Sequence, residues 1–247
     1  MEQLRSKSGF ICDMDGVIYH GDRLLPGARE FIEWLKASGK TPQDLHDKLA
    51  RMGVDVGADH FYTSALSMAR FLSSQMPGCK AYVIGAHGLT TALAKAGVTM
   101  TSENPDFVVV GETPSYDYES IVTASILVSN GARLVATNSD VSAPFEGGIR
   151  PSCGALVAPI EEATGKKAYF VGKPNPLMMR TGLQLLGVHS SEAAIVGDRM
   201  DTDVIAGIET GLDTCLVLSG VTSEEDLASF PYRPRLIAAG VGDIVPA

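Results

Sequence analysis

The sequence predicts an α/β protein with a doubly wound parallel-sheet core. Short apolar runs alternate with amphipathic stretches along the chain, which is the pattern of successive β-α units. Acidic residues directly follow two of the apolar runs, where parallel strands deliver ligand-binding side chains. At 247 residues, the chain is long enough for one large domain or two modest ones.

Each expected strand is a short apolar run bounded by polar residues, glycine or proline. These runs cover residues 9–12, 81–84, 107–110, 134–136, 169–171, 194–196 and 214–218. The expected helices repeat apolar residues at helical spacing. They cover residues 26–38, 41–52, 64–74, 89–96, 118–130, 155–164, 176–186 and 202–210.

The junction between the first two helices does not fit this fold. Only Gly39 and Lys40 separate a helix that ends at Ser38 from one that begins at Thr41. A helix that returns over a parallel sheet must be followed by a strand before the next helix starts. Either a strand has been deleted, or Lys40 and Thr41 are not adjacent in the complete polypeptide. We favour the second explanation, because losing an internal strand would break the sheet.

Charge and cysteine content argue against several classes of protein. The net charge of −9 and the pI near 5.0 disfavour a nucleic-acid polymer as partner, because binding one requires a basic face. Four cysteines without a C-x-x-C pair disfavour a disulfide or zinc framework. No signal-peptide core precedes the first acidic pair, and no apolar run approaches the ~18 residues of a membrane span. We therefore expect a soluble cytoplasmic protein with no membrane partner.

The first candidate site is Asp13-Met14-Asp15-Gly16, directly after the apolar run 9–12. Two carboxylates this close at a strand end repel each other, since neighbouring like charges resist joint ionisation. A divalent cation offsets the repulsion, and hard carboxylate oxygens suit Mg²⁺. The alternative is a surface turn, in which Asp and Gly are also favoured.

The second candidate site, Gly197 to Asp203, again places carboxylates after an apolar run and before a helix. Asp198 is the natural further metal ligand, while Asp203 could orient the loop behind the ligands. Helix capping is the alternative for Asp201 and Asp203.

The third candidate is Lys173, which follows the run 169–171 and could neutralise a phosphate oxygen; a solvated surface lysine is the alternative.

Together the three places resemble the signature of the haloacid dehalogenase superfamily. That signature is D-x-D-G after the first strand, a lysine on a later loop, and G-D-x-x-x-T-D after the next strand. Longer stretches are similar to the NagD-type branch, the bacterial nucleotide and sugar-phosphate phosphatases with a large α/β cap. These stretches, which span nearly the whole chain, are CDMDGVIYHG, LPGAREFIEWL, FYTSA, VGET, NGARLVATNSD, PSCGAL, GKPNP and GDRMDTD.

The resemblance implies that Asp13 is the nucleophile and forms an aspartyl-phosphate. It implies that Asp15 protonates the leaving oxygen and then activates water, and that Met14 and Gly16 of the same loop contact the phosphate. An acid two residues after the nucleophile favours phosphate-ester hydrolysis, because relatives that cleave carbon–halogen bonds lack it. Phosphoryl transfer needs in-line positioning and charge neutralisation, which agrees with this assignment.

The resemblance also implies a single Mg²⁺ held by Asp13, the backbone carbonyl of Asp15, and Asp198, with Asp203 behind them. Lys173 would steady the phosphoryl charge. One expected part is absent: the family has a strand after the first helix that ends in Thr-Asn or Ser-Asn and binds the phosphate. Thr137-Asn138 looks like that pair but lies in the cap-like segment, so we do not assign it this role.

The implied architecture is a core formed by residues 1–78 and 169–247 and a cap formed by residues 79–168. Closure of the cap would exclude water, and the loops 111–118 and 137–148 are candidates for substrate contacts, although exposed loops are the alternative. The cap could also join copies into a homo-oligomer.

The implied activity is Mg²⁺-dependent hydrolysis of a small phosphorylated metabolite, a nucleoside monophosphate such as UMP. A sugar phosphate or pyridoxal phosphate is the alternative substrate. A nucleotide-binding module without catalysis is a rival, as is an inactive scaffold if the strand is truly deleted. The first strand is not followed by G-x-G-x-x-G, which disfavours dinucleotide binding. The acidic pair disfavours a metal-free anion site, because bare carboxylates repel phosphate.

Overall fold

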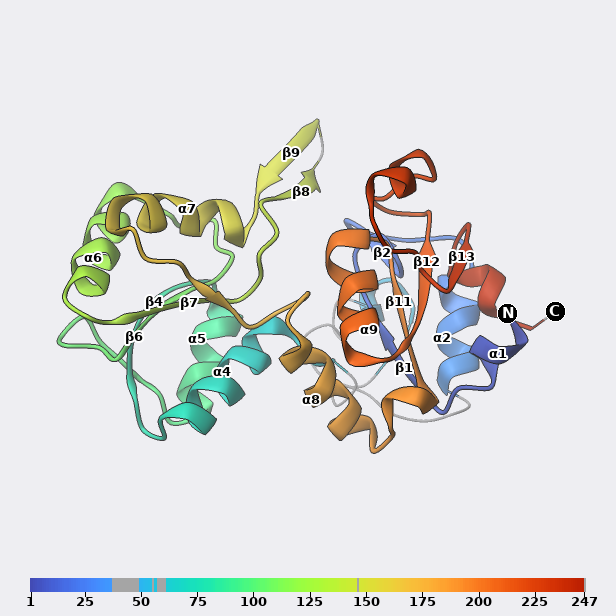
Figure 1. Ribbon diagram of the computed structural model, residues 1–247, viewed down its shortest axis with the longest axis horizontal. Helices are drawn as coiled ribbons and strands as arrows, with labels where there is room; N and C mark the ends of the chain where they lie inside the picture. The colour runs from blue at the N-terminus through green and yellow to red at the C-terminus, as the bar shows by residue number, and fades with distance from the viewer. Residues whose placement is uncertain (37–48, 55, 57–60, 146, 247) are drawn as a thin grey trace. The chain divides into compact units, whose positions relative to one another are not determined.

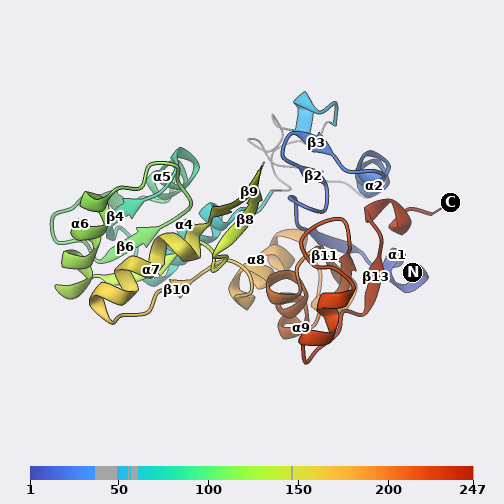
Figure 2. The same cartoon turned by 90° about the horizontal axis from the view of Figure 1, so that it is seen from above.

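The computed structural model describes residues 1–36, 49–54, 56, 61–145 and 147–246 (Figure 1; Figure 2 gives a second view, turned by 90°). The chain divides into two compact units, one made of Met1–Tyr62 with Met179–Ala247 and the other of Thr63–Met178. Both are α/β in construction, as the sequence predicts. In the described part of the chain, no helix has the length and apolar character needed to cross a membrane.

The first unit is built on a parallel sheet in the order β1-β11-β12-β13. Its strands are β1 (Gly9–Cys12), β11 (Ala193–Gly197), β12 (Asp213–Val217) and β13 (Leu236–Ala238). Every residue of β11 is buried, because apolar side chains cover both faces of this central strand. The register aligns Cys12 with Val196 and Val196 with Cys215, so the ends of three neighbouring strands lie together.

Helices and short turns surround this sheet. They are α1 (Glu2–Arg5), α2 (Ala28–Lys36), α9 (Ile205–Thr210), a π-helical turn over Met200–Val204, and 3₁₀ turns over Ser190–Glu192, Glu225–Ser229 and Val241–Ile244. A small antiparallel hairpin, β2 (Tyr19–His20) with β3 (Arg23–Leu24), follows the first acidic pair. Phe31 of α2 is fully buried in the same cluster as Val196 and Val217.

β1 is the outer strand of this sheet within the described ranges, where it pairs with β11. The strand that we expect next to it would lie on the open side of β1. The junction between Lys40 and Thr41 lies outside the described residues, as does most of the helix predicted for 41–52. The expectation of an additional strand therefore stays a prediction.

The second unit has a five-stranded parallel sheet in the order β10-β7-β6-β4-β5. Its strands are β4 (Lys80–Ile84), β5 (Thr99–Met100), β6 (Phe107–Val110), β7 (Arg133–Ala136) and β10 (Tyr169–Phe170), beside a hairpin of β8 (Ser142–Phe145) and β9 (Gly148–Pro151). Its helices are α4 (Ser64–Gln75), α5 (His87–Lys95), α6 (Tyr118–Ser129) and α7 (Cys153–Thr164). Figure 1 shows α4 and α5 on one side of this sheet and α6 and α7 on the other.

The apolar cores of the second unit follow this layering. Met68 and Leu72 of α4 are buried with Val109 on one face of the sheet, and Ile160 of α7 is buried with Val110 on the other. β10 pairs with β7, and α8 (Pro176–Leu186) begins in this unit and continues past its boundary. The unit therefore includes α4 and β10, which lie outside the 79–168 segment expected from sequence. Its action as a cap stays a prediction.

Candidate active site

Asp13 and Asp198 lie side by side because their strands are neighbours. Asp13 directly follows β1, and its backbone N–H continues the ladder by donating to the carbonyl of Val196 at 2.9 Å. Asp198 directly follows β11. Parallel strands end at the same edge of a sheet, so the two carboxylates meet there.

Asp203 joins them from the π-helical turn that follows. One oxygen from each of Asp13, Asp198 and Asp203 lies within 4.8 Å of the others. Asp198 and Asp203 are only 2% and 1% exposed, and Asp13 is half-buried. Three carboxylates this close repel one another strongly when water is excluded, and a divalent cation relieves that repulsion. An all-oxygen donor set is the type that Mg²⁺ prefers, so these residues fit the ion.

Two glycines let the backbone close around Asp198. Gly16 has φ +79°, and a Cβ there would lie 2.5 Å from Oδ2 of Asp198. A Cβ on Gly220 would overlap the same carboxylate. The neighbouring Val221 N–H donates to Oδ2 at 2.7 Å, and the Thr222 N–H donates to the Asp198 carbonyl at 3.0 Å. The loop after β12 thus fixes one oxygen of this carboxylate.

The two acidic residues of the second loop have different surroundings. Asp203 accepts the backbone N–H of Arg199 at 3.2 Å and packs against Gly197, where a Cβ would overlap its side chain. Asp201 instead pairs with the Arg199 guanidinium at 2.9 and 3.1 Å, and its side chain is 53% exposed. Asp203 thus lies in the carboxylate cluster, and its role behind the metal ligands stays a prediction.

Asp15 lies apart from the three clustered carboxylates. Its side chain is 60% exposed, and its Oδ1 lies 3.5 Å from Nδ1 of His20 on β2. The loop that carries it is closed by the backbone: the Gly16 N–H donates to Tyr19, and the Tyr19 N–H donates to the carbonyl of Met14. An exposed carboxylate on a tied loop can exchange protons with a substrate or with water.

The Cys12 thiol and the Tyr19 hydroxyl beside this site stay protonated near neutral pH. Burial, followed by the nearby Cys215 thiol and Asp13 carboxylate, raises the pKa of the Cys12 thiol to about 12. Burial, followed by the charges of Asp15 and Asp13, raises the pKa of Tyr19 to about 12. Neither group offers an anionic nucleophile at this edge.

Lys173 belongs to the second unit, where it follows β10 and is half-buried. Its proposed partnership with the three aspartates therefore stays a prediction. Met14 packs partly buried against the core of the first unit, while its carbonyl accepts the Ile18 and Tyr19 N–H groups. Its contact with a phosphate is likewise a prediction, as is that of Gly16.

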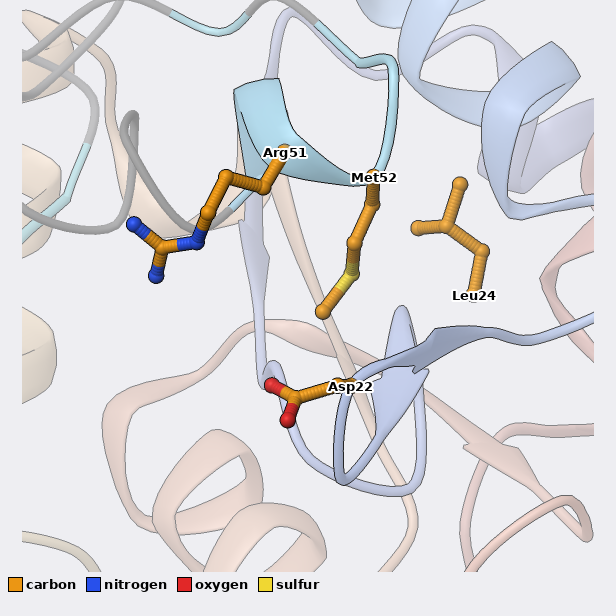
Figure 3. A pocket seen from close by; sticks show the side chains of 4 residues that line it. All are labelled: Asp22, Leu24, Arg51 and Met52. Atoms are coloured by element: carbon orange, nitrogen blue, oxygen red, sulfur yellow. The ribbon is translucent and has the colours of Figure 1, made fainter.

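The β2–β3 hairpin also borders a hollow of about 480 Å³ in the first unit. Figure 3 shows the carboxylate of Asp22 and the guanidinium of Arg51 on its wall, with Leu24 and Met52 beside them. Among the described residues, its lining has one acidic and one basic side chain, which do not indicate a single ligand chemistry.

Sequence reasoning missed His20 and the loop Ser219–Thr222. The second could have been found by the rule that found the aspartates, because this loop follows β12, the next strand of the same sheet. The glycine in this loop, Gly220, at the end of a strand is the feature that indicates it. His20 carried no such signal, since a lone histidine on a short hairpin has no distinctive spacing.

Two family models match the chain. One, described as haloacid dehalogenase-like hydrolase, matches residues 10–99, and one, described as HAD-hydrolase-like, matches residues 170–244. The first match includes Asp13 and Asp15, and the second includes Lys173, Asp198 and Asp203.

Three curated relatives are similar over nearly the whole chain. The ribonucleotide monophosphatase NagD of Escherichia coli is 46% identical over 95% of this chain and 96% of its own. The dihydroxyacetone phosphatase of Corynebacterium glutamicum is 42% identical over 95% and 90%. The acid sugar phosphatase of Staphylococcus aureus is 38% identical over 94% of each chain.

Solved structures agree in fold. NagD from E. coli K-12 superposes with a TM-score of 0.89 at 44% identity, over 97% of this chain and 99% of that one. A glycerol phosphate phosphatase from Mycobacterium tuberculosis, in complex with magnesium, superposes with a TM-score of 0.90 at 27% identity, over 97% and 76%. With these likenesses and the acidic residues in the expected order, the chain belongs to the haloacid dehalogenase superfamily, as a phosphatase of the NagD type.

Proposed function

We propose that this phosphatase hydrolyses phosphomonoesters in a Mg²⁺-dependent reaction through an aspartyl-phosphate on Asp13. The observation that carries the proposal is the convergence of Asp13, Asp198 and Asp203 within 4.8 Å at one sheet edge. Such a cluster is costly without a cation, and a cation beside a carboxylate nucleophile is suited to an anionic phosphoryl substrate.

The reaction proceeds in two displacements. A carboxylate oxygen of Asp13 attacks phosphorus and breaks the bond to the ester oxygen, which takes a proton from Asp15. Asp15, now a carboxylate, removes a proton from water as that water attacks the phosphorus. The phosphorus–oxygen bond to Asp13 breaks, inorganic phosphate leaves, and both aspartates return to their starting states. The exposure of Asp15 and the tied loop around it support its role as proton carrier.

The metal site in this proposal consists of Asp13, the backbone carbonyl of Asp15, and Asp198. Asp203, which we first expected to act from behind the site, is close enough in the cluster to serve as a further ligand. Bound Mg²⁺ would neutralise negative charge on the phosphoryl oxygens. Lys173 would add a second positive charge on that group.

Nucleoside monophosphates such as UMP are the proposed substrates, and the likeness to the ribonucleotide monophosphatase NagD supports them. Sugar phosphates are the first alternative, supported by the likeness to the acid sugar phosphatase and the dihydroxyacetone phosphatase. Pyridoxal phosphate is another alternative substrate, and binding of a phosphate ligand without catalysis is the remote alternative.

The loops 111–118 and 137–148 of the second unit are the proposed substrate-contacting segments. We place the enzyme in the cytoplasm, and a homo-oligomer through the second unit is also proposed.

The test is phosphate release from UMP, several sugar phosphates and pyridoxal phosphate, each with Mg²⁺ and with excess chelator. We expect kcat/KM to be highest for UMP and activity to disappear with the chelator. A higher kcat/KM for a sugar phosphate than for UMP would refute the nucleotide as substrate but would agree with the proposed mechanism. Undiminished activity without divalent metal would refute the metal site.

A further inference from the structure

Asn175 holds both sides of the turn that carries Lys173. Its side-chain Nδ2 donates to the carbonyl of Phe170, the last residue of β10, at 2.8 Å. Its Oδ1 accepts the N–H of Leu177 in the first turn of α8 at 2.9 Å. One amide therefore ties the strand before Lys173 to the helix after it.

The orientation of this amide follows from its partners. Phe170 offers a carbonyl, which needs a donor, and Leu177 offers an N–H, which needs an acceptor. Rotating the amide by 180° would place like groups against each other at both ends. Asparagine is therefore suited to this position, because it carries a donor and an acceptor on one short side chain.

The backbone of the turn is fixed by two further contacts. The N–H of Asn175 donates to the Gly172 carbonyl at 2.9 Å, which closes the turn around Lys173 and Pro174. Gly172 lies directly against Thr137, whose carbonyl oxygen would overlap a Cβ at position 172. The N–H of Val171 donates to Ala136 at 3.0 Å, so the segment before the turn is held on β7.

We propose that Asn175 is a positioning residue that fixes the Lys173 turn between β10 and α8, and thereby the placement of the lysine ammonium group. This inference rests on the proposed role of Lys173 in steadying the phosphoryl charge. Lysine has four rotatable side-chain bonds, so its backbone must be placed accurately for its charge to reach one position. Misplacement of a catalytic group by about 1 Å can cost about 100-fold in rate.

The experiment is a double-mutant cycle on kcat with p-nitrophenyl phosphate and saturating Mg²⁺. We expect Lys173→Ala to lower kcat by about 10²- to 10³-fold and Asn175→Ala to lower it by about 10- to 100-fold. The double variant should match Lys173→Ala within about twofold, because Asn175 would have no lysine left to position.

Glu161 provides the matched control at the other end of the same strand. Its carboxylate accepts the N–H of Ala168, the residue before β10, at 2.7 Å, and the ammonium of Lys167 at 2.9 Å. Glu161→Ala removes a side-chain bond to the backbone next to β10 without touching the Lys173 turn. We expect its kcat to stay within about twofold of the wild type.

Asn175→Ser separates helix capping from positioning. A serine can still accept the Leu177 N–H but is too short to reach Phe170 as well. We expect its melting temperature to be close to that of the wild type and its kcat to stay at least about tenfold low. Wild-type kcat in this variant, or multiplying effects in the double variant, would overturn the positioning role. Unchanged kcat in Lys173→Ala would instead refute the proposed function of Lys173, and the inference with it.

Discussion

The two parallel sheets of this protein present different chemistry at corresponding edges. At the carboxyl edge of the first unit's sheet, three carboxylates from the segments that follow two neighbouring strands gather within 4.8 Å. At the carboxyl edge of the second unit's sheet, side chains satisfy one another: Thr137 Oγ1 donates to Asn138 at 2.8 Å, and Asn138 Nδ2 donates to Asp140 at 2.7 Å. No comparable acidic cluster occurs there among the described residues.

The difference shows that a parallel sheet brings strand ends together, while the residues that follow the strands determine the chemistry at that edge. Both edges bring strand ends together, because all strands in each sheet are parallel. Among the described residues, only the first edge concentrates like charge, which is unfavourable without a counter-ion. At the second edge, Thr137, Asn138 and Asp140 instead pair their polar side chains with one another through hydrogen bonds.

The largest effect should come from removing the nucleophile at the charged edge. Asp13→Asn should abolish turnover, since an amide does not attack phosphorus, and Asp15→Asn should slow it by at least ~10²-fold. Asp201→Asn is the control, because Asp201 lies on the same acidic loop but pairs with Arg199. Steady-state kcat with Mg²⁺ decides the matter. Near-normal kcat in Asp13→Asn would exclude the covalent mechanism.

A smaller effect is expected from disturbing the backbone around Asp198. Gly16→Ala adds a Cβ 2.5 Å from the Asp198 carboxylate at φ +79°, so both stability and Mg²⁺-dependent activity should fall. Gly21→Ala is the matched control on the adjacent hairpin: its φ is +58°, and no atom lies within 4 Å of the added Cβ. It should lose only about 1 kcal/mol of stability from backbone strain. Equal loss of Mg²⁺ affinity in both variants would mean that crowding of Asp198 is unimportant.

Asp203→Asn tests whether the three clustered carboxylates repel one another, because removing one charge should then stabilise the metal-free protein. Without divalent metal, Asp203→Asn should keep or raise the melting temperature, because it removes one of three clustered charges. With Mg²⁺ at about 100 times its Kd, the wild type should gain about 2.7 kcal/mol, and the variant should gain less. Thermal unfolding with chelator and with Mg²⁺ measures both quantities. A clearly destabilised metal-free variant would show that Asp203 contributes structural hydrogen bonds rather than charge repulsion.

The smallest expected effect is a difference between the mass of the intact protein and that of the sequence. It would show whether the first unit's sheet has a further strand. The first unit has four strands in its described sheet and the second has five. If Lys40 and Thr41 are not adjacent, the intact protein should exceed the 26.1 kDa of the sequence by about 1 kDa, or roughly ten residues for a strand and its loop. Intact-protein mass spectrometry decides between the possibilities. A mass equal to that of the sequence would show a true deletion.

The sequence predicts strand ends better than it predicts what gathers around them. The apolar runs before Asp13 and Asp198 identify β1 and β11, because β11 is buried along its whole length and β1 pairs directly with it. The sequence does not predict the short strands β2, β3, β5, β8, β9 and β13, since two to four residues with exposed positions carry no clear period.

The membership of the carboxylate cluster was predicted only in part. Asp203 was expected behind the metal ligands, and helical spacing from residue 202 suggested an ordinary helix. The structure has a π-helical turn over Met200–Val204, and Asp203 is buried in the cluster. A wider turn changes the direction in which a side chain points, and periodicity along a sequence does not report it. Sequence spacing also does not show which sheet a helix packs against, and α4 packs against the sheet of the second unit.

The pairing of β1 with β11 has a consequence for the order in which the protein folds. Gly9 pairs with Ala193, so the first unit cannot complete its sheet until most of the chain has been synthesised. The second unit is one continuous segment, Thr63–Met178, and can fold while it emerges from the ribosome. Contacts between residues so far apart in sequence form slowly, because a long loop must close first. The acidic edge therefore needs residues from both ends of the chain, whereas the second unit needs only its own continuous segment.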